Sequence, residues 1–106
     1  MPKISTNQTC QTVLTTFEVH PGTCADLLEA LQAAYAEVIS KSPGFIAAGL
    51  HVNDAQTRIA NYSQWRRRED FLAMLRTEVM REHNRRFGAM CKSFEPVMYE
   101  VCADFG

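Results

Sequence analysis

The fold is decided by residues 58–65, which read RIANYSQW. The stretch is apolar and β-branched at its start, and a polar turn (53–56) and an arginine run (66–68) bound it, so we expect an interior β-strand. Side chains alternate between the two faces of a strand, which puts Asn61 and Trp65 on one face and Tyr62 on the other. A carboxamide and the only tryptophan of the protein therefore share one wall of the sheet.

Such a wall is unusual for a plain core. A buried Asn61 needs partners for its amide and a buried Trp65 needs an acceptor for its N–H, because each unpaired buried polar group costs about 1–3 kcal/mol. Two interpretations are open: both residues are satisfied core residues, or they are the polar part of a pocket that hydrogen-bonds a ligand.

The flanking patterns predict the other elements. Thr23 is expected to cap an amphipathic helix of about 18 residues, which the turn 42–44 ends because proline disfavours helical geometry in the residue before it. A second helical stretch begins at Glu69, restarts near Thr77 and ends near Met90. The remaining strands are expected at residues 10–19, 45–52 and 94–101, with Pro96 pointing to an edge position for the last.

The predicted order is strand, helix, strand, strand, helix, strand. This order is typical of an α+β, ferredoxin-like βαββαβ fold with a four-stranded antiparallel sheet and both helices on one face. A chain of 106 residues makes one domain, which we place at residues 10–106 after a flexible N-terminus at 1–9. Two such sheets packed face to face would cover what one small domain leaves exposed, so a homodimer is expected.

Composition argues against several classes of protein. The net charge is −1, and acidic residues are interleaved with the arginines, so a nucleic-acid partner is not expected. The four cysteines lie far apart, which indicates reduced thiols rather than a zinc site. The N-terminus lacks the apolar core of a signal peptide, and no run of about 18 apolar residues is present to span a membrane. We therefore expect a cytoplasmic protein.

The chain resembles the antibiotic biosynthesis monooxygenase family in two places: residues 61–65 (NYSQW), with a charged turn and Glu69-Asp70-Phe71 behind them, and residues 42–45 (SPGF). The resemblance covers residues 11–101. Within the family the chain is similar to small oxygenases that convert anthrone-type aromatic polyketide intermediates to quinones. The resemblance implies a dimeric ferredoxin-like barrel, dioxygen as co-substrate, and no flavin, haem or metal.

The resemblance also implies a site. Asn61 and Trp65 match the family's pocket Asn and Trp, His51 matches a pocket histidine and Arg85 a helix arginine, and these four are the candidate catalytic residues. The candidate substrate-binding residues are Phe17, Tyr62, Phe71, Met74 and Leu75. Phe71 departs from the family pattern, because some members have a tyrosine there that is proposed to donate a proton.

The implied mechanism starts with an electron-rich phenolic substrate that loses a proton and, as an anion, reduces dioxygen; the peroxide then loses water to leave a quinone. Asn61 and Trp65 would donate N–H groups to the developing negative charge, each contributing on the order of 3 kcal/mol. Arg85 would add positive charge, and His51 would be the base.

Three alternatives stay open. A non-catalytic ligand-binding or auxiliary dimer would keep only the scaffold. A haem-degrading enzyme of the same family would use His83, although Thr15 stands where that group has an Asn and Met74 or Leu75 where it has a Trp; otherwise His83 is expected to be a surface residue. A small-quinol monooxygenase would differ in the size of its pocket.

Overall fold

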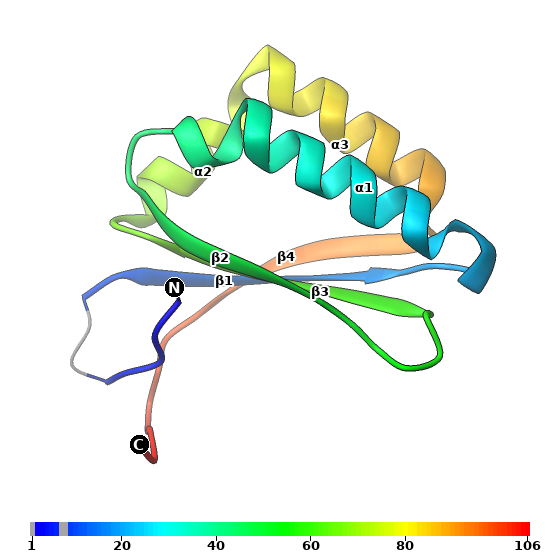
Figure 1. Ribbon diagram of the computed structural model, residues 1–106. Helices are drawn as coiled ribbons and strands as arrows, with labels where there is room; N and C mark the ends of the chain where they lie inside the picture. Colours follow the sequence, from blue (N-terminus) through cyan, green and yellow to red (C-terminus); the bar gives the residue numbers. More distant parts are fainter. Residues whose placement is uncertain (1, 7–8) are drawn as a thin grey trace.

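A four-stranded antiparallel sheet carries its helices on one face, as the computed structural model of the chain shows (Figure 1). The structure describes residues 2–6 and 9–106. The elements are β1 (Gln11–Glu18), α1 (Pro21–Glu37), the short 3-10 helix η1 (Ile39–Lys41), β2 (Phe45–Val52), β3 (Arg58–Trp65), α2 (Arg68–Arg76), α3 (Glu78–Met90) and β4 (Ser93–Tyr99). The predicted ferredoxin-like fold is confirmed.

The strands lie in the order β2-β3-β1-β4, so β3 and β1 form the centre of the sheet. The position of β3 as an interior strand agrees with the sequence. Pro96 lies on the edge strand β4, where a missing N–H removes no bond that the sheet needs.

The start of α1 differs from the prediction. The helix begins at Pro21, and His20 precedes it. Proline suits the first helical position because its fixed φ is already helical and its absent N–H is one that the helix leaves unpaired. Thr23 therefore lies inside the first turn, where its hydroxyl donates to the His20 carbonyl at 3.2 Å, and does not cap the helix.

The predicted restart of the second helical stretch is confirmed. Thr77 separates α2 from α3, and its hydroxyl oxygen accepts a hydrogen bond from the Met80 N–H at 3.2 Å. This side-chain cap satisfies one of the N–H groups that a new helix leaves unpaired. Because of this break, α2 lies near the end of the sheet and α3 turns back to run alongside α1 (Figure 1).

The two faces of the sheet have different covers. The helices bury one face, where Val13, Phe17, Ile59 and Trp65 belong to the hydrophobic core. Both termini lie on the other side of the sheet (Figure 1). There the Lys3 backbone N–H donates to Gln64 Oε1 at 3.2 Å, and Thr6 bonds to Asp104. The described tails thus cross the face that carries no helices.

Candidate active site

A cavity of about 250 Å³ lies between the helices and the sheet. Its lining comes from all three α-helices, η1, β1, β3 and β4, so the closed fold is needed to form it. The residues that line it are Thr15, Phe17, Leu31, Tyr35, Ile39, Asn61, Ser63, Trp65, Phe71, Met74, Leu75, Met80, Asn84, Phe87, Phe94 and Pro96. The lining is mostly apolar, with a few hydroxyls and two carboxamides, as is usual for small-molecule sites.

Aromatic rings form two of the cavity's walls. Trp65 is fully buried and meets Phe71 edge-on, with ring centroids 5.7 Å apart. On the other side Phe17 stacks on Phe94 at 5.0 Å. Rings that are packed against one another in this way keep their orientation, so the cavity offers flat, rigid surfaces to a flat ligand.

A chain of hydrogen bonds links the polar side chains of the cavity. The Trp65 Nε1–H donates to Ser63 Oγ at 3.1 Å. Ser63 is also hydrogen-bonded to Tyr35. The Tyr35 hydroxyl in turn donates to Asn61 Oδ1 at 2.5 Å. The indole, two hydroxyls and the amide are therefore held as one unit on the wall that α1 and β3 share.

This chain of bonds fixes the direction of the Asn61 amide. Its oxygen is engaged by Tyr35, while no residue in the described part of the chain accepts a hydrogen bond from Nδ2. Because Asn61 lines the cavity and no buried polar side-chain atom of the described residues lacks a partner, the amide N–H group is available to a bound molecule. Trp65 differs, since its N–H is already bonded within the protein.

Tyr35 is the ionisable member of this lining: none of the other described residues around the cavity carries an acidic or basic side chain. Burial raises the pKa of Tyr35 from 10.0 to about 12, and the hydrogen bonds to Asn61 and Ser63 oppose that rise. The desolvation of the charged form dominates. Tyr35 is consequently a neutral phenol near pH 7 (about five pH units below this pKa).

Six of the nine residues selected from the sequence line the cavity. They are Asn61, Trp65, Phe17, Phe71, Met74 and Leu75. The structure brings them together because β3 and β1 place Asn61 and Phe17 on the helix-covered face while α2 lies across the end of the sheet. Their catalytic and binding roles stay predictions.

His51 and Tyr62 lie on the open face of the sheet. A β-bulge between Phe45 and Ala47 shifts the alternation of β2, so that Leu50 pairs with Asn61 and His51 pairs with Ala60. Cross-strand partners share a face, and Ala60 and Tyr62 point away from the helices. Within one chain, neither His51 nor Tyr62 reaches the cavity.

Arg85 lies on the exposed side of α3, where its guanidinium is 2.9 Å from the Glu82 carboxylate. The preceding residue, Asn84, lines the cavity together with Met80 and Phe87. Asn84 follows Met80 by four residues and precedes Phe87 by three, and this helical spacing is the sequence signal that puts it on the same face.

His83 is not the surface residue that we expected. It is only 7% exposed, and its Nε2 is 3.3 Å from a Glu37 carboxylate oxygen on α1. Its ring stacks on Phe87, and His83 itself is not part of the cavity lining. The residue therefore joins α1 to α3 behind the cavity wall.

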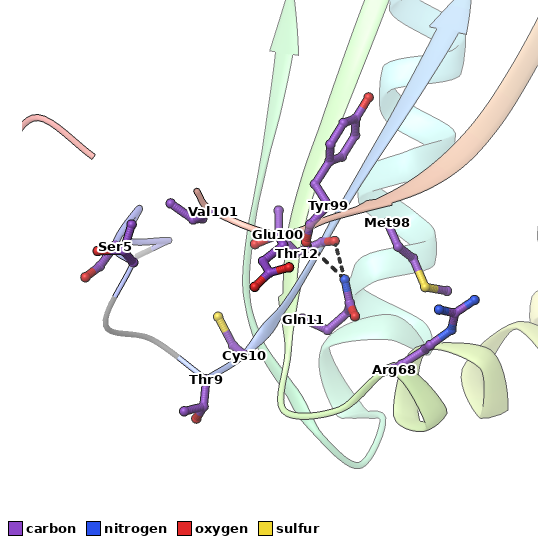
Figure 2. A pocket seen from close by; sticks show the side chains of 11 residues that line it. Ser5, Thr9, Cys10, Gln11, Thr12, Arg68, Met98, Tyr99, Glu100 and Val101 are labelled. Atoms are coloured by element: carbon purple, nitrogen blue, oxygen red, sulfur yellow. Dashed lines mark hydrogen bonds between the residues drawn. The ribbon is translucent and has the colours of Figure 1, made fainter. Parts of the chain in front are cut away.

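A second hollow, of about 430 Å³, lies at the outer ends of β1 and β4, beside the two tails (Figure 2). Its walls are mainly polar, and Gln11 bridges the two strands there by donating to the Thr12 and Tyr99 carbonyls at 2.9 and 3.1 Å. None of the residues selected from the sequence lines it. A wet, polar hollow of this kind offers little to an aromatic ligand.

Among the described residues, no three histidine, cysteine or acidic side chains are arranged to hold a metal ion. Every helix among them is too short or too polar to cross a lipid bilayer.

The family model described as "Antibiotic biosynthesis monooxygenase" matches residues 11–86 of the chain, which include the cavity residues from β1 to Asn84. The chain belongs to the antibiotic biosynthesis monooxygenase family. The resemblance seen in residues 42–45 and 61–71 is thereby confirmed.

Individual relatives agree with this membership. The chain is 29% identical over 109 residues to tetracenomycin-F1 monooxygenase of Streptomyces glaucescens, covering 100% of this chain and 94% of that protein. Its fold is similar to that of SnoaB, a cofactor-independent oxygenase from Streptomyces nogalater (TM-score 0.80, 18% identity, 92% of this chain and 97% of SnoaB). It is also similar to the monooxygenase ActVA-Orf6 of Streptomyces coelicolor in complex with nanaomycin D (TM-score 0.78, 20% identity, 95% and 96%).

Proposed function

We propose that this family member is a cofactor-independent monooxygenase that oxidises an aromatic, polyketide-type substrate, an anthrone or a hydroquinone, to a quinone with dioxygen. The observation that carries the proposal is the aromatic-walled cavity in which the amide N–H group of Asn61 is available to a ligand. The relatives support it, since they include a cofactor-independent oxygenase and a monooxygenase in complex with nanaomycin D.

The reaction balances without a cofactor. For an anthrone, the ring CH₂ loses a proton, and the resulting anion gives one electron to dioxygen. The substrate radical and superoxide combine, forming a C–O bond, and the peroxide is protonated. Loss of the remaining C–H proton then breaks the O–O bond and leaves C=O and water. The substrate supplies both reducing electron pairs, so the protein has only to bind, stabilise negative charge and move protons.

Asn61 is the proposed donor to the negative charge. A hydrogen-bond donor that is already oriented toward a developing oxyanion contributes about 3 kcal/mol in a site without water. Trp65 has a different proposed role from the one the sequence suggested, because its N–H is bonded to Ser63. Its indole face would pack on the substrate rings instead.

His51 as base and Arg85 as fixed charge remain predictions from the family resemblance. Neither lines the cavity of a single chain, so each would require a second chain or a movement of its element. The substrate anion of a phenolic anthrone is stabilised by its own conjugation, and solvent can therefore accept the first proton.

The cavity volume favours the smaller substrates within this proposal. About 250 Å³ lies just below the 300–1,000 Å³ that is usual for sites of drug-sized ligands. Met74 and Met80 line the cavity, and their flexible thioether chains can adjust to a larger ring system. A one- or two-ring hydroquinone is therefore a second candidate beside the three-ring anthrone.

We also propose that the protein is a homodimer that pairs the open faces of two sheets. Leu14, Tyr62 and Val97 lie in one row across that face, and Tyr99 beside them is 50% exposed. Apolar side chains gathered on one exposed face are typical of an interface. The family resemblance led to the same expectation.

The experiment is aerobic turnover of dithranol, and in parallel of a one-ring hydroquinone, by purified protein with chelator and no added cofactor. Quinone absorbance and oxygen uptake are followed together. We expect one dioxygen consumed per quinone formed from the anthrone. Asn61→Ala should lower the rate above background by about 10²–10³-fold. Gln32→Ala, which removes an exposed amide outside the cavity on α1, should leave it unchanged.

The outcomes separate the alternatives. Binding of quinone without turnover would support the non-catalytic module and overturn the enzyme. A Soret shift on addition of haem would favour haem degradation. Turnover of the hydroquinone alone would place the protein among small-quinol oxidases, and equal rates for the wild type and Asn61→Ala would overturn the proposed site.

A further inference from the structure

We propose that Tyr35 is the residue that exchanges protons with the oxygenated substrate, an inference that rests on the proposed function. The family resemblance points to position 71 for a proton donor, but Phe71 has no hydroxyl. Tyr35 comes from a different element, α1, and lines the same cavity beside Asn61.

The geometry places Tyr35 beside the oxyanion. Its hydroxyl is 2.5 Å from Asn61 Oδ1, so it contacts one end of the same carboxamide whose other end, Nδ2, is available to a ligand. A peroxide held by Nδ2 would therefore lie next to the phenol. A rotation about the Tyr35 C–O bond turns the O–H from Asn61 toward that peroxide.

Chemistry allows no other side chain in the lining to take this role. The remaining polar groups among the described lining residues are the hydroxyls of Thr15 and Ser63, the amides of Asn61 and Asn84, and the indole N–H of Trp65. None of these is acidic enough to protonate a peroxide and survive as its anion in a dry site. A phenol is.

The proton cycle closes on Tyr35 itself. The peroxide anion takes the phenolic proton, giving a hydroperoxide and a Tyr35 phenolate. The phenolate then removes the remaining C–H proton of the substrate; the O–O bond breaks, the carbonyl forms, and hydroxide leaves. Hydroxide combines with the proton released in the first step to give water, and Tyr35 is a phenol again.

The neighbours of Tyr35 suit both halves of this cycle. Burial raises the pKa of Tyr35, so the group is protonated when the peroxide forms. Ser63 then stabilises the phenolate, and the Trp65 N–H strengthens the Ser63 hydroxyl as a donor because it bonds to the same oxygen. The bonded Trp65 N–H thus supports the phenolate through Ser63.

The test is Tyr35→Phe, measured in two ways. The affinity for the quinone formed from dithranol is read from quenching of Trp65, the only tryptophan, and kcat is read from dithranol turnover. We expect kcat to fall by about 100-fold or more while the Kd changes less than about threefold, as is typical for the loss of a general acid. A solvent isotope effect on kcat in the wild type should be lost in the variant.

Two further variants make the outcome specific. Tyr99→Phe removes the hydroxyl of a tyrosine on the other side of the sheet and should leave kcat unchanged. The double variant Tyr35→Phe/Phe71→Tyr returns a phenol to the cavity at the ring that meets Trp65, and it should recover part of kcat. If Tyr35→Phe fails to fold by circular dichroism, Ser63→Ala takes its place, with an expected fall in kcat of about tenfold.

The inference is wrong if a folded Tyr35→Phe (or Ser63→Ala) protein oxidises dithranol with an unchanged kcat. A weaker Kd with kcat unchanged would mean that Tyr35 only orients Asn61, which also overturns the inference. No turnover by the wild type, with either substrate, would remove the proposed function and the proton cycle with it. Failure of Tyr35 alone leaves the wild-type turnover in place.

Discussion

The two faces of the one sheet carry different chemistry, although they are built from the same strands. On β3, Asn61 and Trp65 point into the cavity under the helices, while Tyr62 between them points to the open side. Trp65 is fully buried, whereas Tyr62 is half-buried on the face that carries no helices. The pleat therefore separates the face that lines the cavity from the face that carries no helices.

The difference lies in what covers each face. Under the helices the polar groups are few, and four of them are linked, from Trp65 through Ser63 and Tyr35 to Asn61. On the open face the described tails supply the partners, as Lys3 does for Gln64. The helices enclose a cavity on one face, whereas only the described tails lie over the other.

The largest expected effect is on stability and comes from Trp65→Ala. Truncating a fully buried aromatic residue loses its transfer energy and leaves a cavity, so the free energy of unfolding should fall by about 3–5 kcal/mol. Tyr62→Ala, three residues earlier on the open face, should cost less than half as much. Urea unfolding followed by circular dichroism at one protein concentration measures both, and equal losses would show that the two faces are packed alike.

The open face should also be needed for the dimer. Leu14→Arg would place a charge in the middle of that face, and an unpaired charge buried at an interface costs about 3 kcal/mol or more, a hundredfold in association. We expect sedimentation to show the wild type as a dimer and Leu14→Arg as a monomer. Val79→Arg changes an equally apolar exposed residue on the helix layer and should stay dimeric. A monomeric wild type would remove the proposal.

Secondary structure followed closely from the sequence. The bounds of β2 and β3 are the predicted ones, because β-branched runs and flanking turns are local signals. The position of His51 could not be predicted, because no local sequence pattern indicates the β-bulge in β2. Simple alternation from Phe45 puts His51 on the helix-covered face, and the bulge after Phe45 moves it to the other.

The cavity was only partly predictable for similar reasons. Tyr35 belongs to the apolar stripe of α1, and its ring is predicted to be a core residue on that basis. Helical periodicity does not indicate that its hydroxyl contacts Asn61, 26 residues away. Arg85 follows Asn84 directly, and consecutive residues point about 100° apart around a helix. A small error in the predicted orientation of the helix therefore selects Arg85, which forms an exposed ion pair, in place of Asn84, which lines the cavity. Tertiary contacts, not local patterns, decide both.

A smaller effect should separate the tyrosines of the two faces at high pH. The folded-state pKa of Tyr35 is about 12 against 10.0 in its ordinary state, so the unfolded chain loses this proton first as pH rises. The stabilisation that comes from the buried, protonated Tyr35 is fully present below about pH 10. It is lost as pH rises toward 12, which lowers the free energy of unfolding by roughly 2–3 kcal/mol. Unfolding of wild type and Tyr35→Phe across this range measures the difference.

Other groups also affect unfolding at high pH; burial raises the pKa of Cys91, for example, but it does so in both proteins and cancels in the comparison. Tyr99→Phe is the control and should keep the wild-type decline. If the wild type and Tyr35→Phe declined equally, the phenol would not be protected from water, and the contrast in burial between the two faces would weaken.

The smallest expected effect concerns the lid of helices over the cavity. Thr77 caps α3 at the junction where Met74 lies on one side and Met80 on the other, and both methionines line the cavity. Thr77→Ala should lower the free energy of unfolding by about 1 kcal/mol, because the Met80 N–H loses its acceptor. Thr77→Ser keeps the hydroxyl and should cost much less. Quinone affinity, read from Trp65 quenching, should weaken in the alanine variant and not in the serine variant. An unchanged affinity in both would mean that the cavity does not depend on how firmly these two helices are joined.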